Sequence, residues 1–376
     1  MATTSAKKRV LVMLPVLDLG GAEKQGLYCA KSLKESGNYE VEVWALANGS
    51  GTLIPTLIQS QITYRDTEIG FDVFRNRWKR LTAYYQFWMM LISGKFDAII
   101  PFTYHCNILC NSIFRLAGIK KCLWFQIAME FHLPLTIWEK LARFMKPTYA
   151  ANSMAAGGFI ADKHAINPVN VAFIPNPFEL VPPKKSKQEW LDQLNLSEND
   201  VLMVMVANYF PEKDHASLIQ AMPKLLVVNP NLKLLFAGGL VPENRVNALK
   251  AQAFDLTLVE KVKFIGSTND IAGLLLTCHI GILNSRSEGS PNSLIEYMGY
   301  GLPVIASSIP AIVELLGDDY PYLFQVDDST DFTTKAENLL KCLGNVDNLV
   351  NENKQIISKT YSVSSNFQAF NRLLEK

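Results

Sequence analysis

The chain has 376 residues, of which 49% are hydrophobic and 19% are charged, and its formal net charge is +1. This composition is that of a globular protein and excludes a disordered or fibrous chain. Because the net charge is close to zero, no global electric field favours binding to nucleic acid or to a membrane.

The length and the cysteine pattern narrow the class of protein further. Single hydrophobic cores stop growing near ~250–300 residues, so we expect more than one domain. The six cysteines are scattered with no C-x-x-C pair, which predicts reduced thiols in a cytoplasmic protein.

The apolar run at residues 10–16 ends in Asp18 and a Gly-Gly pair, so we expect a first buried strand and not a signal peptide. No apolar stretch approaches the ~20 residues of a transmembrane helix.

Short apolar runs alternate with amphipathic stretches along the first half of the chain. We expect a helix to begin near Ala22 and two more helices to follow at residues 81–93 and 135–145. The predicted strands cover residues 9–16, 39–46, 96–102, 120–126 and 148–153. This alternation is typical of parallel sheets covered by helices.

The alternation pauses at residues 167–187, where prolines accumulate, and then begins again. The predicted strands of the second half cover residues 201–207, 232–239, 262–267, 280–285, 302–307 and 322–326. Helices are expected at residues 215–228, 242–254, 270–278 and 291–300. The sequence therefore predicts an α/β protein with two successive Rossmann-like, doubly wound domains.

A pair of glycines follows the first predicted strand in DLGGAEKQ, residues 18–25. Gly20 and Gly21 remove side chains where a backbone must come close to another group. The amides and the dipole at the start of the next helix favour an anion, typically a phosphate. The dinucleotide fingerprint G-x-G-x-x-G is absent. A tight turn between strand and helix also explains these glycines.

Lys213 lies in the loop VANYFPEKDH, residues 206–215, which follows the first strand of the second half. Ligands of open α/β sheets bind beyond the carboxyl ends of the strands, and a lysine there can neutralise a phosphate. Glycines end the strands at FAGG, residues 236–239, and FIGS, residues 264–267, where a flat ring could lie near backbone groups. Taken singly, a solvated lysine and ordinary strand-end glycines explain these features too.

The stretch SRSEGSPNSLIEYM, residues 285–298, predicts a helix that begins within it. Ser290 is a favoured N-cap and Pro291 a favoured first helical residue. We expect the helix to run from Pro291 to about Tyr300 and to stop at Gly301. Its predicted apolar face consists of Leu294, Ile295 and Met298.

Two carboxylates flank this helix start. Glu288 precedes the cap, and Glu296 lies on the helix away from the apolar face. The amides of Asn292 and Ser293, together with the helix dipole, make the space between them favourable for an anion. Because carboxylates accept hydrogen bonds from sugar hydroxyls, the pattern suits a nucleoside diphosphate sugar. A structural acid near a helix start and a solvated mid-helix glutamate are the alternative interpretation.

The stretch EGSPNSLIEYMGYGLPVIAS resembles the E-x7-E segment of retaining GT-B glycosyltransferases, which are family 4-like members of glycosyl transferases group 1. The segments GGAEKQ, IPNP, YFPEKDH and FIG occur in that family's order, so the resemblance covers nearly the whole chain. It implies a GT-B fold with two domains facing across a cleft. The expected divisions are an acceptor-side domain at 1–175, a nucleotide-sugar-binding domain at 176–357, and a C-terminal helix at 358–376 that crosses back to the first domain.

The resemblance also implies roles for individual residues. Glu288 would bind hydroxyls of the donor hexose and Lys213 would neutralise its diphosphate, and these two would be the catalytic residues. Glu296 would hold the ribose hydroxyls, and the backbone near Gly266 would receive the base. The other expected donor-binding positions are Gly20, Gly21, Asn208, Gly289, Ser290, Asn292 and Ser293.

The chain departs from the family's pattern at two places. Many members have an arginine five residues before the lysine, where this chain has Asn208, so one cation on the leaving diphosphate is missing from the loop. Many members also have a histidine after the strand that matches residues 120–126. Here Gln126 is nearest to that place, and His105 and His132 are other candidates for the acceptor or sugar side.

The implied reaction transfers a hexose, with retention at the anomeric carbon, to a glycan or lipid-linked glycan acceptor. No carboxylate nucleophile is clearly assigned in the family, so catalysis would rest on stabilising the departing diphosphate and positioning the acceptor. No Asp-x-Asp in a plausible place and no metal-ligand cluster appears, so neither a metal nor another cofactor is expected. Two alternatives stay open, a nucleotide-sugar-binding protein without turnover and a GT-B-fold nucleotide-sugar epimerase. The hexose, base, acceptor and oligomeric state are not encoded in a readable pattern.

Residues 74–91 combine basic and aromatic side chains on one amphipathic segment. Such a segment can contact an anionic bilayer surface, which would suit a lipid-linked acceptor at the inner face of the membrane. A Rossmann helix with an apolar core face and a basic first turn is the alternative.

Overall fold

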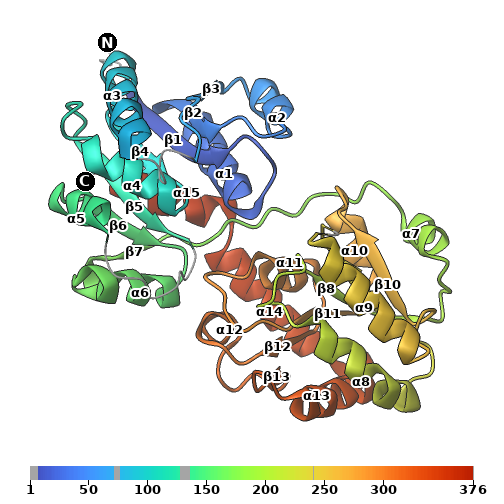
Figure 1. The fold of residues 1–376 in the computed structure, drawn as a ribbon. Coiled ribbons are helices and arrows are strands. Elements are labelled where there is room, and N and C mark those ends of the chain that lie inside the picture. The colour runs from blue at the N-terminus through green and yellow to red at the C-terminus, as the bar shows by residue number, and fades with distance from the viewer. Residues whose placement is uncertain (1–6, 72–76, 128–135, 240, 376) are drawn as a thin grey trace. The chain divides into compact units, whose positions relative to one another are not determined.

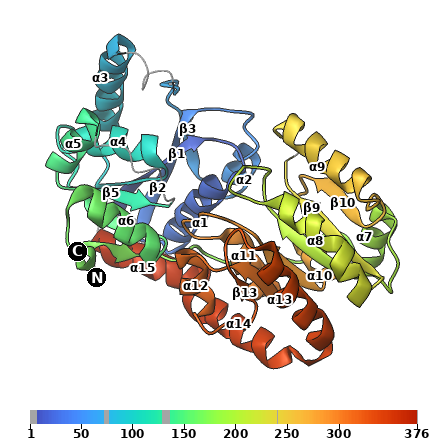
Figure 2. The same cartoon turned by 60° about the horizontal axis from the view of Figure 1, so that its bottom comes forward.

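The computed structural model describes residues 7–71, 77–127, 136–239 and 241–375. The chain forms two compact units. Unit 1 comprises the chain up to Pro177 and again from Ser362 onward, and unit 2 comprises Phe178–Tyr361. In each unit, helices cover the faces of a sheet (Figures 1 and 2).

Unit 1 is built on a seven-stranded sheet in the order β3-β2-β1-β4-β5-β6-β7, in which every pair of neighbours is parallel. Its strands are β1 Lys8–Val16, β2 Tyr39–Ala47, β3 Thr63–Asp66, β4 Ala98–Pro101, β5 Lys121–Gln126, β6 Thr148–Ala151 and β7 Ala172–Phe173. Its helices are α1 Gly21–Glu35, α2 Ile54–Gln59, α3 Arg77–Gly94, α4 Tyr104–Ile113, α5 Ile137–Phe144, α6 Met154–His164 and α15 Val363–Glu375.

The last helix, α15, completes unit 1. It packs beside α1, and Phe370 contributes to the core that includes Phe102 and Phe125. Asn366 donates a hydrogen bond of 2.7 Å to the carbonyl of Pro175, and the Lys8 ammonium donates one of 3.0 Å to the carbonyl of Leu374. The end of the chain is therefore fixed to the sheet with which the chain begins.

Unit 2 is built on a six-stranded sheet in the order β10-β9-β8-β11-β12-β13, again with parallel neighbours. Its strands are β8 Val201–Val206, β9 Leu232–Ala237, β10 Val262–Gly266, β11 Ile280–Leu283, β12 Val304–Ser307 and β13 Leu323–Phe324. Its helices are α7 Lys187–Leu194, α8 His215–Val228, α9 Glu243–Asp255, α10 Ile271–Thr277, α11 Asn292–Tyr300, α12 Pro310–Leu316, α13 Ser329–Cys342 and α14 Asp347–Thr360.

The predicted fold class of two doubly wound parallel α/β sheets is confirmed. The short strand β7 lies within the proline-rich stretch at 167–187, where the sequence predicts no strand. It pairs with β6 over two residues, Ala172 and Phe173. A two-residue edge strand needs no long apolar run, so the pattern of hydrophobic residues does not predict it.

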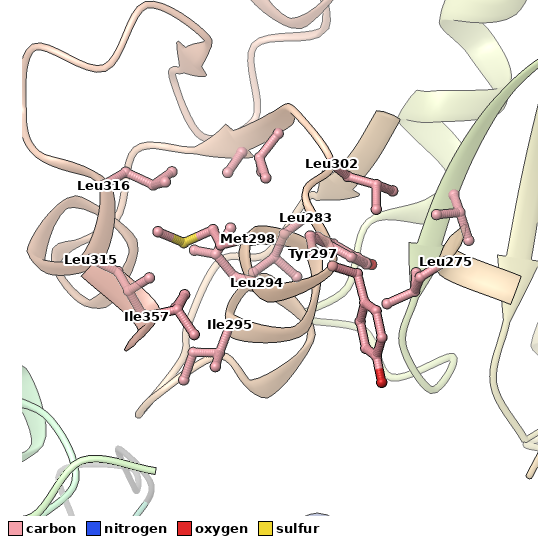
Figure 3. Close-up of a cluster of buried hydrophobic side chains, with 14 of the residues drawn as sticks. Leu275, Leu283, Leu294, Ile295, Tyr297, Met298, Leu302, Leu315, Leu316 and Ile357 are labelled. Atoms are coloured by element: carbon pink, nitrogen blue, oxygen red, sulfur yellow. The ribbon is translucent and has the colours of Figure 1, made fainter. Parts of the chain in front are cut away.

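Helix α11 is held by an apolar face, as predicted, but it begins one residue later than predicted. Leu294, Ile295 and Met298 are buried, and Tyr297 lies among them (Figure 3). The cap is Pro291 and not Ser290, since the first intrahelical bond runs from the Ile295 amide to the Pro291 carbonyl. Pro291 adopts φ −77° and ψ 97°, an extended conformation outside the helix.

Candidate functional site

Strands β8 and β11 lie side by side at the centre of the second sheet. From β8 the chain proceeds through β9 and β10 to one edge, and from β11 it proceeds through β12 and β13 to the other. The carboxyl ends of β8 and β11 therefore flank the point where the strand order reverses, which is where open α/β sheets bind ligands. The two loops that leave this point lead into α8 and α11.

Lys213 and Glu288 come from these two loops and form an ion pair. Their side chains are 19% and 13% exposed, so both charges are largely removed from water. Lys213 also forms an isolated antiparallel bridge with Ser285. The structure thus unites the two predicted catalytic residues, which are far apart in sequence, in one ammonium–carboxylate contact.

The two loops are joined along their backbones as well. The Asp214 amide donates to the Asn284 carbonyl at 3.2 Å, and the Arg286 amide donates to the Glu212 carbonyl at 2.9 Å. The Asn284 side chain returns a bond of 2.8 Å to the Asp214 carbonyl. These bonds fix the position from which Lys213 reaches Glu288.

Arg286 reinforces this junction, and sequence reasoning assigned it no role. Its guanidinium donates to the Pro211 carbonyl at 3.0 Å and to Asp327 at 2.7 Å, and it lies 3.5 Å from Asp214. The Asp327 carboxylate is the main cause that raises the pKa of Arg286. The sequence feature that could have pointed to Arg286 is its place two residues before Glu288, in a loop at the end of a strand.

The start of α11 borders the Lys213–Glu288 pair in sequence. Gly289 and Ser290 connect Glu288 to the cap, and the cap contributes no side-chain hydrogen bond to the helix start. Asn292 and Ser293 form the first turn, and both are half-buried. Glu296 is half-buried one turn further on, next to the buried Tyr297, whose hydroxyl accepts a bond of 2.6 Å from the Val206 amide at the end of β8.

Asn208 ties the end of β8 to the end of β9. Its side-chain oxygen accepts a hydrogen bond of 3.1 Å from the Gly239 amide. The Gly238 amide in turn donates to the Gly266 carbonyl at 3.1 Å. Gly266 has φ +80°, a conformation that glycine adopts without strain. A side chain on Gly238 would overlap the Ala207 carbonyl, so the three strand ends meet closely.

In unit 1, Gly20 and Gly21 mark the start of α1, as predicted from the sequence. Gly20 is its N-cap without a side-chain bond, and both glycines are exposed. A Cβ atom on Gly20 would overlap the Glu23 carboxylate. Burial, together with the charge of Asp18, raises the pKa of Glu23. In this structure the Glu23 carboxylate therefore occupies the space that a side chain at position 20 would take.

Two of the predicted acceptor-side residues, His105 and Gln126, lie at or just beyond the carboxyl ends of neighbouring strands of unit 1. His105 follows β4 in the first turn of α4, its ring lies 5.7 Å from that of Phe71, and burial lowers its pKa. Gln126 is the buried last residue of β5, and its side-chain oxygen accepts a bond of 3.2 Å from Trp124. His132 lies outside the described residues. Within the described ranges, no three His, Cys, Asp or Glu side chains are grouped as metal ligands.

His215 is a buried histidine directly after the lysine loop. Its Nδ1 lies 2.7 Å from the Lys213 carbonyl and therefore carries the proton, since a carbonyl only accepts. Its ring stacks on Tyr209 at 4.6 Å, and in the described part of the chain no group hydrogen-bonds Nε2. Burial lowers the pKa of His215 from 6.5 to about 4, so the folded protein holds this ring neutral.

We expect unit 2 to lose stability as the pH falls from 6.5 towards 4. In this window the unfolded chain protonates His215 and the folded chain does not, so each pH unit should cost about 1.4 kcal/mol. Urea denaturation at pH 7 and pH 5 would measure the loss, and His215→Gln should make it smaller, while burial also lowers the pKa of His279 and of His164. An equal loss in wild type and variant would contradict this assignment.

Residues 186–359, which include Lys213 and Glu288, match the family described as Glycosyl transferases group 1. N-acetyl-alpha-D-glucosaminyl L-malate synthase of Bacillus anthracis is 27% identical over 159 residues, which are 42% of this chain and 41% of that protein. UDP-Gal:alpha-D-GlcNAc-diphosphoundecaprenol alpha-1,3-galactosyltransferase of Escherichia coli is 25% identical over 174 residues, 44% of each. The chain thus matches less than half the length of these two curated relatives.

Solved structures resemble the chain over nearly its whole length. Anabaena HepE in complex with UDP has a TM-score of 0.81 at 18% identity, over 98% of this chain and 99% of HepE. A glycosyltransferase from Rickettsia africae has a TM-score of 0.82 at 17% identity, over 98% of each chain. At these identities the likeness shows the fold alone, and that fold is GT-B.

Proposed function

We propose, from the premise that residues 186–359 belong to Glycosyl transferases group 1, that this GT-B protein transfers a hexose from a nucleoside diphosphate sugar with retention of anomeric configuration. The acceptor that we propose is a glycan or a lipid-linked glycan. One observation carries the proposal: the Lys213–Glu288 ion pair at the point where the strand order of the second sheet reverses. Relatives named for galactosyl transfer to a diphosphoundecaprenol-linked sugar and for O-antigen biosynthesis support this acceptor class.

In this proposal the charged groups of the site promote cleavage of the bond between the sugar and the diphosphate. The Lys213 ammonium moves from Glu288 to the diphosphate and stabilises the negative charge that grows as the bond from the anomeric carbon to the diphosphate oxygen breaks. The start of α11 adds the positive end of its dipole. Glu288, released from Lys213, accepts hydrogen bonds from hexose hydroxyls.

We assign the remaining donor contacts by the family resemblance. Glu296 would hold the ribose hydroxyls, and the backbone at Gly266 would receive the base. Asn208 does not replace the family's arginine as a cation, since it is neutral and its oxygen binds the Gly239 amide. Lys213 would therefore carry more of the diphosphate's charge than in relatives that have both cations.

The proposed acceptor side is unit 1. His105 follows β4, and Gln126 ends β5, its neighbour in the sheet. In retention by same-face attack, the acceptor hydroxyl gives its proton to the departing diphosphate, so these residues would position the acceptor and take no proton. The cytoplasmic location stays a prediction from the sequence.

A panel of nucleotide sugars should reveal the donor through thermal stabilisation. A ligand at 100 times its Kd stabilises the folded state by about 2.7 kcal/mol, so the correct donor should raise the melting temperature of the protein. UDP-, GDP- and ADP-linked hexoses should be compared with the matching free nucleoside diphosphates. If no nucleotide sugar stabilises the protein, the proposed donor class is wrong.

Release of nucleoside diphosphate then separates the transferase from its alternatives. A transferase should release it faster when acceptor is added, whereas a binding protein without turnover should bind the donor and release nothing. An epimerase should convert the sugar without any acceptor. Either of the last two results would contradict the proposal of glycosyl transfer.

A further inference from the structure

Helix α3 of unit 1 carries a continuous stripe of exposed apolar side chains. The stripe consists of Trp78, Leu81, Tyr85, Met89 and Ile92, whose exposed fractions lie between 41% and 70%. Their spacings of three and four residues place them on one face of the helix. A second apolar stripe, Tyr84, Phe87 and Leu91, is buried against the sheet side of the unit. The hydrophobic core of unit 1 therefore uses the second stripe, and the exposed stripe takes no part in that core.

Helix α5 is built in the same way and lies in contact with α3. The ring of Trp138 in α5 lies 4.7 Å from that of Tyr84 and 5.3 Å from the guanidinium carbon of Arg80. On its outer side, α5 exposes Ile137 by 75% and Phe144 by 77%. Two touching helices thus present large apolar side chains to solvent, and Figure 2 shows both at the outer part of unit 1.

The exposed charges on these two helices are positive. Helix α3 contains no acidic residue, and the single acid of α5, Glu139, is buried and paired with Lys163 at 2.8 Å. Lys79, Lys140 and Arg143 are exposed on the same helices. The surface formed by α3 and α5 is therefore apolar, aromatic and basic.

The charge pattern selects the partner. A symmetric dimer would place this surface against its own copy and so bring cations against cations. An anionic bilayer matches both the aromatic side chains and the positive charges of this surface. Tryptophan and tyrosine favour the headgroup region, and lysine and arginine bind lipid phosphates. Apolar patches of this kind on a protein surface mark interaction sites.

We propose that the α3–α5 surface docks on an anionic lipid bilayer. Trp78, Leu81 and Tyr85 of α3, with Phe144 of α5, enter the headgroup layer, while Lys140 and Arg143 contact lipid phosphates. Docking requires no turnover, so this inference stands apart from the proposed glycosyl transfer. It extends the expectation for residues 74–91 to α5, a helix that the sequence had not connected with that segment.

Co-sedimentation of the full chain with vesicles tests the proposal. Binding should be strong to phosphatidylcholine vesicles that contain phosphatidylglycerol, weak to phosphatidylcholine alone, and weaker in high salt. Each basic residue near an anionic surface contributes about fivefold in affinity, so Lys140→Gln with Arg143→Gln should weaken binding on the order of 25-fold. Trp78→Ser with Tyr85→Ser should also lower binding, by removing the aromatic anchors.

Matched control variants lie in unit 2. Phe254→Ser removes a side chain that is 71% exposed, and Lys224→Gln removes an exposed charge from α8, and both should bind vesicles as the wild type does. Unchanged melting temperatures would show that the α3 and α5 variants are folded. Equal binding to neutral and anionic vesicles, or wild-type binding by both double variants, would overturn the proposal. A dimer that Trp78→Ser dissociates would assign the surface to a second copy of the chain and overturn it too.

Discussion

Glu288→Gln should lower turnover by about 10²- to 10³-fold, the loss that follows when a preorganised charged contact is removed from a reacting centre. Glutamine keeps the size of the side chain and one acceptor oxygen, but it loses the negative charge. Lys213 therefore keeps a hydrogen-bond partner, and the free energy of unfolding should fall by only about 1 kcal/mol. Nucleoside diphosphate release and urea denaturation of the same preparation measure the two effects.

The control for this variant is Glu260→Gln on the same unit. Glu260 pairs with Lys263 at 3.0 Å, but its side chain is 77% exposed, so the pair lies in water. Its loss should change neither turnover nor stability measurably, because water screens an exposed ion pair. If Glu288→Gln were as active as Glu260→Gln, Glu288 would have no part in catalysis.

Lys213→Met should lower turnover by a similar factor, about 10²- to 10³-fold, and should also destabilise unit 2. The chain has no arginine at position 208 to share the charge of the diphosphate. Methionine leaves the largely buried Glu288 carboxylate without its cation, which should cost about 2 kcal/mol, less than for a fully buried pair. Steady-state kinetics and urea denaturation again separate the two effects.

A double-mutant cycle tests whether the two residues act together. If they do, the variant with both substitutions should be about as slow as the slower single variant and more stable than Lys213→Met alone, because no unpaired charge remains. The cycle on Lys263 and Glu260 should be additive. Additive losses at Lys213 and Glu288 would show that the ion pair is incidental to turnover.

The fold could be predicted from sequence because β/α alternation is a local property. Apolar runs of strand length, separated by helical periodicity, predict a parallel sheet before any contact is known. The start of α11 was displaced by one residue because Ser290 and Pro291 can both occupy a cap or first-turn position, and only backbone geometry distinguishes them.

The contacts of the site were less accessible to sequence reasoning. Lys213 and Glu288 could each be placed at the end of a strand, but their ion pair depends on β8 and β11 being neighbours, which is a property of topology. Arg286 contacts two other segments, the loop that contains Pro211 and Asp214 and the segment that contains Asp327. No local sequence pattern predicts such a junction. The two apolar stripes of α3 look alike in sequence, and only the packing shows which one is buried.

The mutual neutralisation of Lys213 and Glu288 has a consequence for selectivity. A ligand that offers only an anion can bind the Lys213 ammonium, but the Glu288 carboxylate is then left with an uncompensated charge. A ligand that carries a hexose on its diphosphate offers the phosphates to Lys213 and the hexose hydroxyls to Glu288 in one event. Within the proposed reaction, the intact donor would then be favoured over the spent nucleotide, and cleavage of the sugar would itself help to eject the product.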